Sequence, residues 1–147
     1  MTSTPGEARP PDAAEATSGT GAIAWGLGLL AIVCFPFVSS VVAGMVMFVV
    51  GRAQRTKGVL ARENGRRAAN WGLTYALSTV VLVGVPFFLG AVVLEPGAAD
   101  EYGLDLPVTV FWVVTLWHVV LCVWGAVVAH RGRVFWGNGI HFLHGAG

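Results

Sequence analysis

The sequence predicts an all-helical integral membrane protein, and three observations lead to this fold class. The chain of 147 residues is 55% hydrophobic and only 12% charged, about half the charged share of an average soluble domain. Three charge-free apolar stretches, at 21–51, 68–94 and 106–129, each exceed the roughly 20 residues that cross a bilayer as a helix. The roughly 10-residue alternating pattern of a membrane barrel does not occur. Helices are then the structures that satisfy their own backbone groups in hydrocarbon.

The first apolar stretch, 21–51, is longer than one span requires. As a single helix it would be about 46 Å long, whereas the hydrocarbon core measures about 30 Å. Pro36 lies near its middle and removes a backbone donor there. Either one long helix kinks at Pro36, giving three spans and an external N-terminus, or two short helices form a hairpin, giving four spans and an internal N-terminus. The residues alone leave both arrangements open.

The second apolar stretch also contains a proline. Because 68–94 is too short for two crossings, we expect Pro86 to kink a single helix.

The first twenty residues differ in composition from the rest. Residues 1–20 are rich in Pro, Ala, Ser, Thr and Gly and lack apolar periodicity, so we expect a disordered tail there and a helical membrane domain over 21–147. The flank before the first apolar stretch is net acidic and the stretch is long, which is unlike a signal peptide. We therefore expect this stretch to be retained.

Charges are distributed unevenly between the two loops expected to join the spans. The loop 52–67 holds six basic residues against Glu63 alone, whereas the loop 95–105 holds four acidic residues and no Lys or Arg. The positive-inside rule then predicts a multi-pass protein of the cell membrane, with 52–67 and the C-terminus cytoplasmic and 95–105 external. Basic residues beside a span are explained by orientation and anionic headgroups. We expect the lipid bilayer as a partner and no nucleic acid.

His118 is the ionisable residue that lies within an apolar stretch, with Thr115 and Cys122 one turn to either side. With Cys34 and Cys122 it could supply three soft metal ligands. No fourth ligand has recognisable spacing, and a neutral imidazole bonded across a helix interface is common. The sequence therefore predicts no metal site and no cofactor. The histidines of the C-terminal segment are interpreted as solvated or headgroup-facing side chains: His130, His141 and His144.

Catalytic groups are not recognisable in the apolar stretches. They contain no carboxylate, and Ser39, Ser40 and Ser78 lie outside any Gly-x-Ser-x-Gly context. We therefore expect a protein that is not an enzyme.

Small residues recur every four positions at the start of the third predicted helix: Ala68, Gly72 and Ala76. Such a stripe lets two helices approach closely. Internal packing is the preferred interpretation, and a self-association face is the alternative. Asn70 either satisfies backbone groups at the helix end or lines a polar entrance between helices.

Aromatic residues mark the predicted membrane interfaces. Trp71, Trp112 and Trp136 are predicted to be interfacial anchors. The segment after Ala129, too short and too rich in Gly to span, is predicted to lie on the inner membrane surface.

The run Ala68-Ala69-Asn70-Trp71, placed after a basic segment, resembles a signature of small bacterial membrane proteins that carry the domain of unknown function numbered 4870. That family is similar to the Tic-twenty-like import component of the chloroplast inner envelope. Arg67 and Gly72 depart from the signature, which has an acidic residue and Gln there. Near the C-terminus, Arg131-Gly132-Arg133 with Phe135-Trp136 and Ile140 to Leu143 is similar to the closing segment of the family. The resemblance implies four helices, with the first two as a hairpin broken near Pro36.

Two functions follow from these features. The first is a non-enzymatic structural or accessory role, through helix association with further copies of the chain or with another membrane protein. The second is a transport or protein-translocation role, as the resemblance to the import component implies. Water-soluble probes reaching Asn70, Thr74, Ser78 and His118 would favour transport. The positions singled out for the family motif, packing or polarity are Ala68, Ala69, Asn70, Trp71, Gly72, Ala76 and His118.

Overall fold

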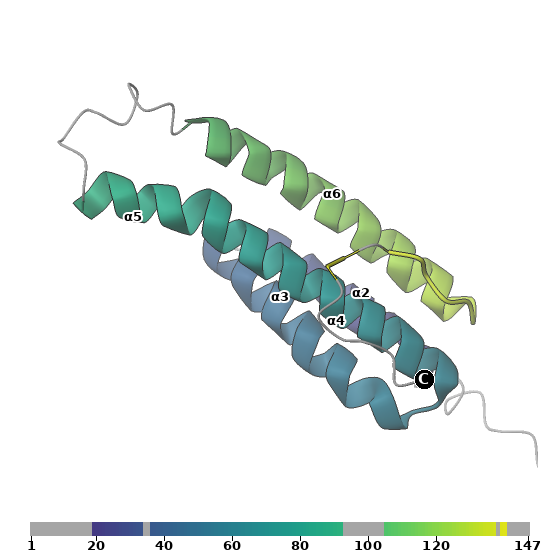
Figure 1. Cartoon of the computed structure of the whole chain (residues 1–147). Coiled ribbons are helices and arrows are strands. Elements are labelled where there is room, and N and C mark those ends of the chain that lie inside the picture. Colours follow the sequence, from purple (N-terminus) through teal and green to yellow (C-terminus); the bar gives the residue numbers. More distant parts are fainter. Residues whose placement is uncertain (1–18, 34–35, 93–104, 138, 141–147) are drawn as a thin grey trace, which may run out of the picture.

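The computed structural model describes residues 19–33, 36–92, 105–137 and 139–140. Within them every regular element is helical (Figure 1), which confirms the predicted fold class. The elements are α2 (Ala22–Gly26), the 3₁₀ helix η1 (Leu27–Ile32), α3 (Pro36–Ala53), the 3₁₀ helix η2 (Gln54–Thr56), α4 (Val59–Thr79), the π-helix η3 (Val80–Gly84), α5 (Val85–Val92) and α6 (Asp105–His130). Residues 1–18 of the predicted tail and most of the acidic loop lie outside the described residues.

Three helices in the described part are long and apolar enough to cross a membrane: Phe37–Thr56, Val59–Val92 and Asp105–His130. The second comprises α4, η3 and α5, which form one continuous rod (Figure 1). The apolar segment Ala22–Ile32 is shorter. The described part of the chain therefore has four apolar helical segments, three of them of spanning length.

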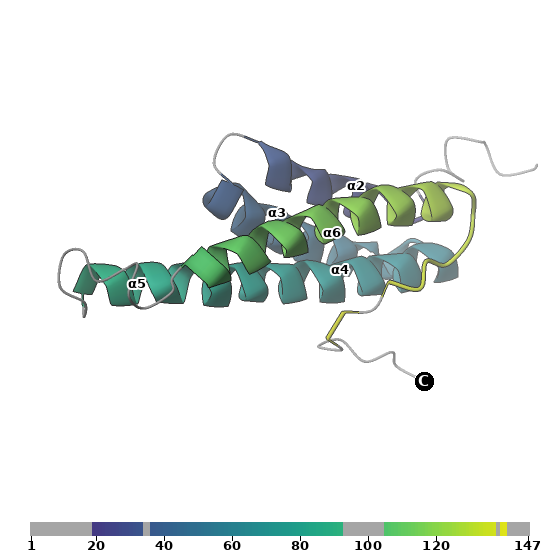
Figure 2. The ribbon, with the colours of Figure 1, turned by 90° about the horizontal axis from the view of Figure 1, so that it is seen from above.

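The first apolar stretch is a hairpin, which is the arrangement that the family resemblance implied and one of the two that the residues left open. Pro36 begins α3 instead of kinking a longer helix, which suits a residue that has no N–H to donate. The Ser39 hydroxyl donates to the Ala31 carbonyl at 3.0 Å and ties the two arms together. Figure 2 shows α2 and α3 along the half of the rod that carries α4, with α6 crossing over the rod.

The distortion expected at Pro86 takes the form of the π-helix η3, directly before α5. Pro86 cannot donate to the carbonyl four residues earlier, and its ring crowds that carbonyl. A wider π-helical turn accommodates this without ending the rod.

The prediction of a loop over 52–67 is wrong, because most of this basic segment is helical. Arg52 lies in the last turn of α3, and α4 already begins at Val59. The true turn is short and passes through Gly58, whose φ of 104° favours glycine. Charges exclude a segment from hydrocarbon, but they do not end a helix, so α4 continues beyond its apolar part.

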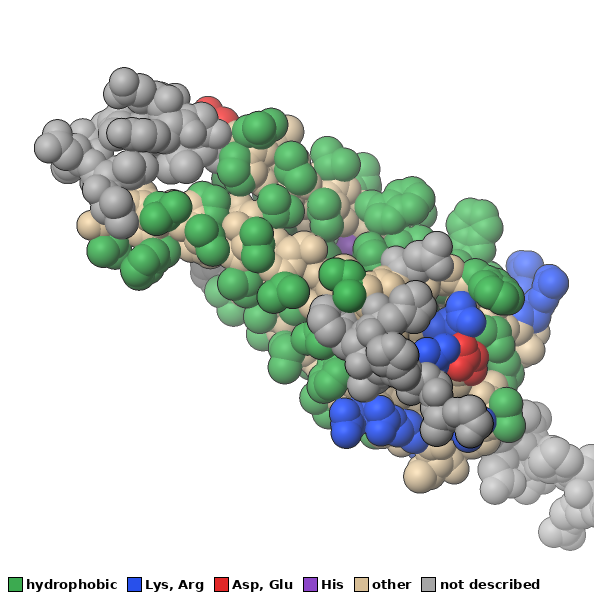
Figure 3. Space-filling view, viewed as in Figure 1, with side chains coloured by type: hydrophobic (Ala, Val, Ile, Leu, Met, Phe, Trp, Pro, Cys, Tyr) green, Lys and Arg blue, Asp and Glu red, His purple; other side chains and the backbone are tan. Residues whose placement is uncertain are grey.

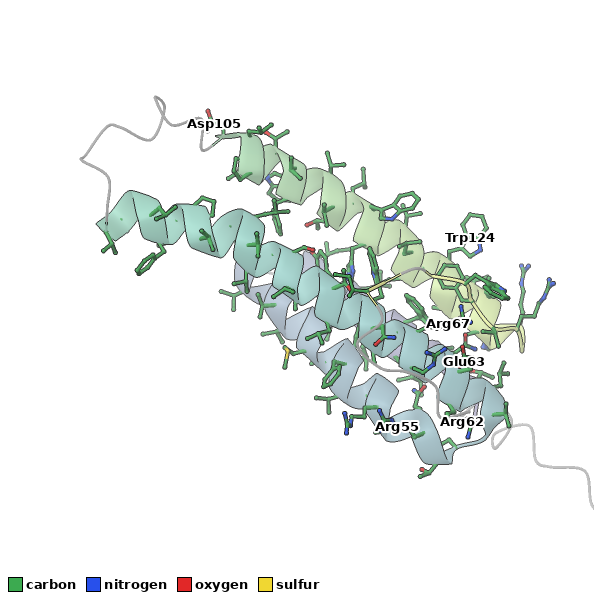
Figure 4. The ribbon with its side chains drawn as sticks, viewed as in Figure 1. Arg55, Arg62, Glu63, Arg67, Asp105 and Trp124 are labelled. Atoms are coloured by element: carbon green, nitrogen blue, oxygen red, sulfur yellow. The ribbon has the colours of Figure 1, made fainter. Side chains whose placement is uncertain are left out.

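The core lies where four elements meet. Trp25, Met47 and Cys122 are wholly buried and Trp71 nearly so, and they come from α2, α3, α6 and α4. Around this core the outer helix surfaces are largely apolar (Figure 3). Basic side chains gather at the end where α3 meets α4, and Asp105 lies at the other end of the molecule (Figures 3 and 4).

Candidate functional site

The polar centre of the bundle is built around His118, which lies midway along α6 and is wholly buried. The Trp71 indole Nε1 donates to His118 Nδ1 at 3.0 Å. His118 Nε2 lies 3.0 Å from the Gly28 carbonyl oxygen. Because a carbonyl only accepts, Nε2 carries the proton and Nδ1 accepts from the indole. The imidazole is therefore neutral, and both of its nitrogens are bonded.

Aromatic stacking holds the same imidazole from α4. The rings of Tyr75 and His118 are stacked with centroids 3.7 Å apart and planes 12° apart. Trp71, one turn earlier on α4, is stacked at 6.1 Å. The Tyr75 hydroxyl then lies 2.8 Å from Ser40 Oγ and 3.1 Å from Thr115 Oγ1. Hydrogen bonds and stacking together connect α3, α4 and α6.

The three residues considered as metal ligands, Cys34, His118 and Cys122, are not brought together among the described residues. Cys34 lies outside them, and both nitrogens of His118 bond to protein groups. The Cys122 thiol lies 3.4 Å from His118 Nε2. Across the described ranges, no three His, Cys, Asp or Glu residues are grouped so that they could hold a metal ion.

The small-residue stripe lies between α3 and α4. Ala68, Gly72 and Ala76 are buried there. A Cβ added to Gly44 would lie 2.8 Å from the Ala76 Cβ and would meet the Gly72 carbonyl oxygen even more closely. Gly51 approaches Ala69 in the same way. The stripe therefore serves close packing inside the chain.

Trp71 is not an interfacial anchor, contrary to the sequence prediction. It is 8% exposed, because its indole N–H has a partner in His118 deep in the bundle. Trp112 and Trp136 are exposed. Asn70 is 4% exposed, and its carbonyl accepts a hydrogen bond from the Thr74 hydroxyl.

Asn64 joins three segments of the chain at the basic end, and the sequence analysis did not single it out. Its side-chain amide donates to the carbonyls of Thr20 at 2.9 Å and Arg133 at 3.0 Å. Its Oδ1 accepts from the Phe135 N–H at 2.9 Å. The signal for its burial is its position on the α4 face that also carries Ala61 and Ala68.

The described part of the segment after Ala129 folds back along α4, which differs from the predicted position on the membrane surface. Besides the bonds to Asn64, the Ile140 N–H donates to Thr74 Oγ1 at 2.9 Å. Phe135 packs edge-on against Trp25, with centroids 5.0 Å apart. An extended segment has unpaired backbone groups, and polar side chains of α4 provide partners for them.

The basic end carries one internal ion-pair cluster. Glu63 pairs with Arg66 at 2.7 Å and with Arg67 at 2.8 Å. Arg67 also lies 4.7 Å from the centre of the Trp136 ring. Further basic side chains at this end are exposed: Arg52, Arg55, Lys57, Arg62, Arg131 and Arg133. The end is therefore strongly positive even after the Glu63 pairs are formed.

Comparison with known proteins corrects the family resemblance. The family model that matches is neither that of the domain numbered 4870 nor that of the chloroplast import component. The resemblance was not specific, because small residues and a tryptophan at a helix interface occur in many membrane bundles. This applies to the run Ala68-Ala69-Asn70-Trp71. No curated protein and no solved structure matches the chain. The match covers residues 17–140, and the chain belongs to the MamF/MmsF family, the magnetosome magnetite crystal formation protein family.

Proposed function

We propose that this protein is a non-enzymatic accessory protein of magnetite crystal formation. It resides in the magnetosome membrane and works by associating with further copies of itself or with another protein of that membrane. The family to which the chain belongs supports the process and the location. The outer face of α6 supports the mode of action.

That face carries large apolar side chains along its length. Trp117, at the middle of α6, is 57% exposed, and Trp124 is 62% exposed and projects away from the bundle (Figure 4). Tryptophan usually lies at the membrane interface, where its N–H meets water. A mid-span indole facing outward gains a partner for its N–H, and a large packing area, from a neighbouring protein helix. The outward exposure of Trp117 at the middle of α6 is therefore the observation that supports association.

The bonding of His118 supports a role without catalysis. A general base needs a free nitrogen, and a metal ligand needs a free lone pair. Nδ1 of His118 already accepts from Trp71, and Nε2 donates to Gly28. The role of the imidazole in this proposal is structural: it joins α4 to α6.

The uneven charge of the two ends supports one orientation. We place the basic end, where Arg55 and Arg62 lie, on the cytoplasmic side and Asp105 on the opposite side (Figure 4).

Association is tested by replacing Trp117 with a photo-crosslinking amino acid in native membranes and identifying adducts by mass spectrometry. An adduct of twice the monomer mass shows self-association, and a specific heterologous adduct shows an accessory contact. The matched control is the same probe at Val81, which is 55% exposed on η3. Adducts at Trp117 no stronger than those at Val81 contradict association through this face.

The process is tested in a magnetite-forming bacterium that lacks its own family member. Expression of this chain is expected to restore crystal size, measured by electron microscopy. Trp117→Ala is expected to restore it poorly, while Val81→Ala restores it fully, at equal amounts of protein in the membrane. Equal crystals with the unmodified chain and with no chain would contradict the proposed function.

A further inference from the structure

The first arm of the N-terminal hairpin is shorter than a bilayer. Ala22–Ile32 comprises one turn of α-helix and the 3₁₀ helix η1. At about 1.5 Å and 2.0 Å per residue, respectively, this arm is about 20 Å long, whereas the hydrocarbon core is about 30 Å thick. The arm therefore does not reach from one interface to the other.

The second arm, α3, also ends short of the rod beside it. Gly44 packs against Gly72 and Ala76, and Gly51 packs against Gly65 and Ala69. The two helices are therefore antiparallel, and each residue nearer the start of α3 lies beside a residue one position later on the rod. If this pairing continues to the start of α3, Pro36 lies beside Leu82 in η3. The rod continues from there to Val92, about 15 Å farther at 1.5 Å per residue.

Contacts with α6 agree with this position of the hairpin tip. Phe37, at the start of α3, packs on Phe111, with ring centroids 5.1 Å apart. Thr115, one turn later on α6, bonds to Tyr75 on α4. In Figures 1 and 2, α5 and the first turns of α6 extend beyond the end of α3.

The surfaces around and beyond the tip are apolar and exposed. Val33 and Val38, on either side of the tip, are 52% and 67% exposed, and Phe87, on α5, is 78% exposed. An open groove of about 580 Å³ separates the tip from the rod and is lined by Phe37, Val38, Val83 and Phe87, among others. Such surfaces belong in hydrocarbon, both at the tip and beyond it.

We propose that α2, η1 and α3 form a re-entrant hairpin, which enters the membrane from the basic end and returns to it. Only the α4–α5 rod and α6 then cross the bilayer, and acyl chains of bilayer lipids fill the groove between the start of α3 and the rod. The backbone at the base of the hairpin is paired inside the protein, since Asn64 bonds the Thr20 carbonyl. The topology does not depend on the proposed function.

Cysteine labelling distinguishes this topology from a crossing hairpin. The background is Cys34→Ala with the wholly buried Cys122 retained. Val33→Cys is expected to react with a membrane-impermeant maleimide from neither side of sealed vesicles. Two matched controls react from one side each: Thr56→Cys from the basic side and Asp105→Cys from the acidic side. Reaction of Val33→Cys from the acidic side, at the rate of Asp105→Cys, overturns the proposal.

Depth measurement separates burial in lipid from burial in protein. A fluorophore on Val33→Cys is expected to be quenched more strongly by lipids with a nitroxide at acyl position 12 than at position 5. The order reverses for the same fluorophore on Thr56→Cys and on Asp105→Cys. Stronger quenching of Val33→Cys by the position-5 lipid places the tip at an interface and overturns the re-entrant topology.

Discussion

The indole N–H of Trp71 donates to Nδ1 of His118 across 3.0 Å and thereby fixes which imidazole nitrogen carries the proton. The bond connects the rod from α4 to α5 with α6. It also leaves Nε2 to donate to Gly28 in η1. One imidazole thus positions the N-terminal hairpin against both longer helices.

Trp71→Phe is expected to lower the free energy of unfolding by about 1–2 kcal/mol. The phenyl ring keeps part of the stacking, but Nδ1 of the buried His118 loses its donor. Unfolding by titration with sodium dodecyl sulfate in mixed micelles measures the change. Trp136→Phe is the matched control, because Trp136 is 76% exposed. Equal stability of the two variants would show that the indole–imidazole bond contributes nothing.

Tyr75 and Ser40 are expected to be energetically coupled. Their hydroxyls lie 2.8 Å apart in the buried chain that continues to Thr115. The double variant Ser40→Ala, Tyr75→Phe should cost less than the sum of the single variants, by roughly 0.5–1.5 kcal/mol. The same micelle titration measures this cycle. Strict additivity would mean that the two hydroxyls do not stabilise each other.

Gly44→Ala is expected to destabilise the bundle by about 1–3 kcal/mol, because the new methyl group meets the Gly72 backbone, which cannot move aside without separating the helices. Gly26→Ala is the matched control: it is also helical, and a Cβ there meets nothing within 4 Å. Thermal unfolding in detergent compares the two. A Gly44→Ala melting temperature no lower than that of Gly26→Ala would contradict the close packing of α3 on α4.

The sequence predicted the features that depend on hydrophobicity. The length of the apolar stretches predicted the helical class. The length of the first stretch also predicted a break near Pro36, but the residues alone did not decide between a kink and a hairpin. The stripe through Gly72 was visible because helical spacing places small residues on one face.

The features missed by sequence reasoning depend on pairing between distant segments. The partner of Trp71 lies 47 residues away in the chain, and those of Asn64 lie 44 to 71 residues away. No spacing rule connects such positions. The basic segment was predicted to be a loop because charge marks the membrane boundary, whereas helix ends depend on caps and glycines such as Gly58.

Asn64 is expected to hold the C-terminal segment in place, because the three bonds of its amide connect α4 with Thr20, Arg133 and Phe135. Asn64→Ala removes all three and leaves the segment tethered by Ile140 and by packing. Trypsin should then cut after Arg131 and Arg133, both exposed, several-fold faster in detergent-solubilised protein. Native-state cleavage rates follow the population of the opened segment.

Thr74→Val provides the matched comparison for Asn64→Ala. The bond it removes from the C-terminal segment is that to the Ile140 N–H, beyond both cleavage sites, and the other bond it removes, to the Asn70 carbonyl, lies within α4. Its effect on cleavage after Arg133 should be small, because Asn64 still bonds the backbone of Arg133 and Phe135 next to the cleavage site. Cleavage after Lys57, in the exposed turn before α4, serves as the internal reference and should be equal in both variants. Equal increases in the cleavage rate for Asn64→Ala and Thr74→Val would mean that contacts along the whole segment hold it in place, and that Asn64 contributes no more than the others. A selective effect of Asn64→Ala would instead show that one buried amide at the basic end fixes the path of the chain after α6.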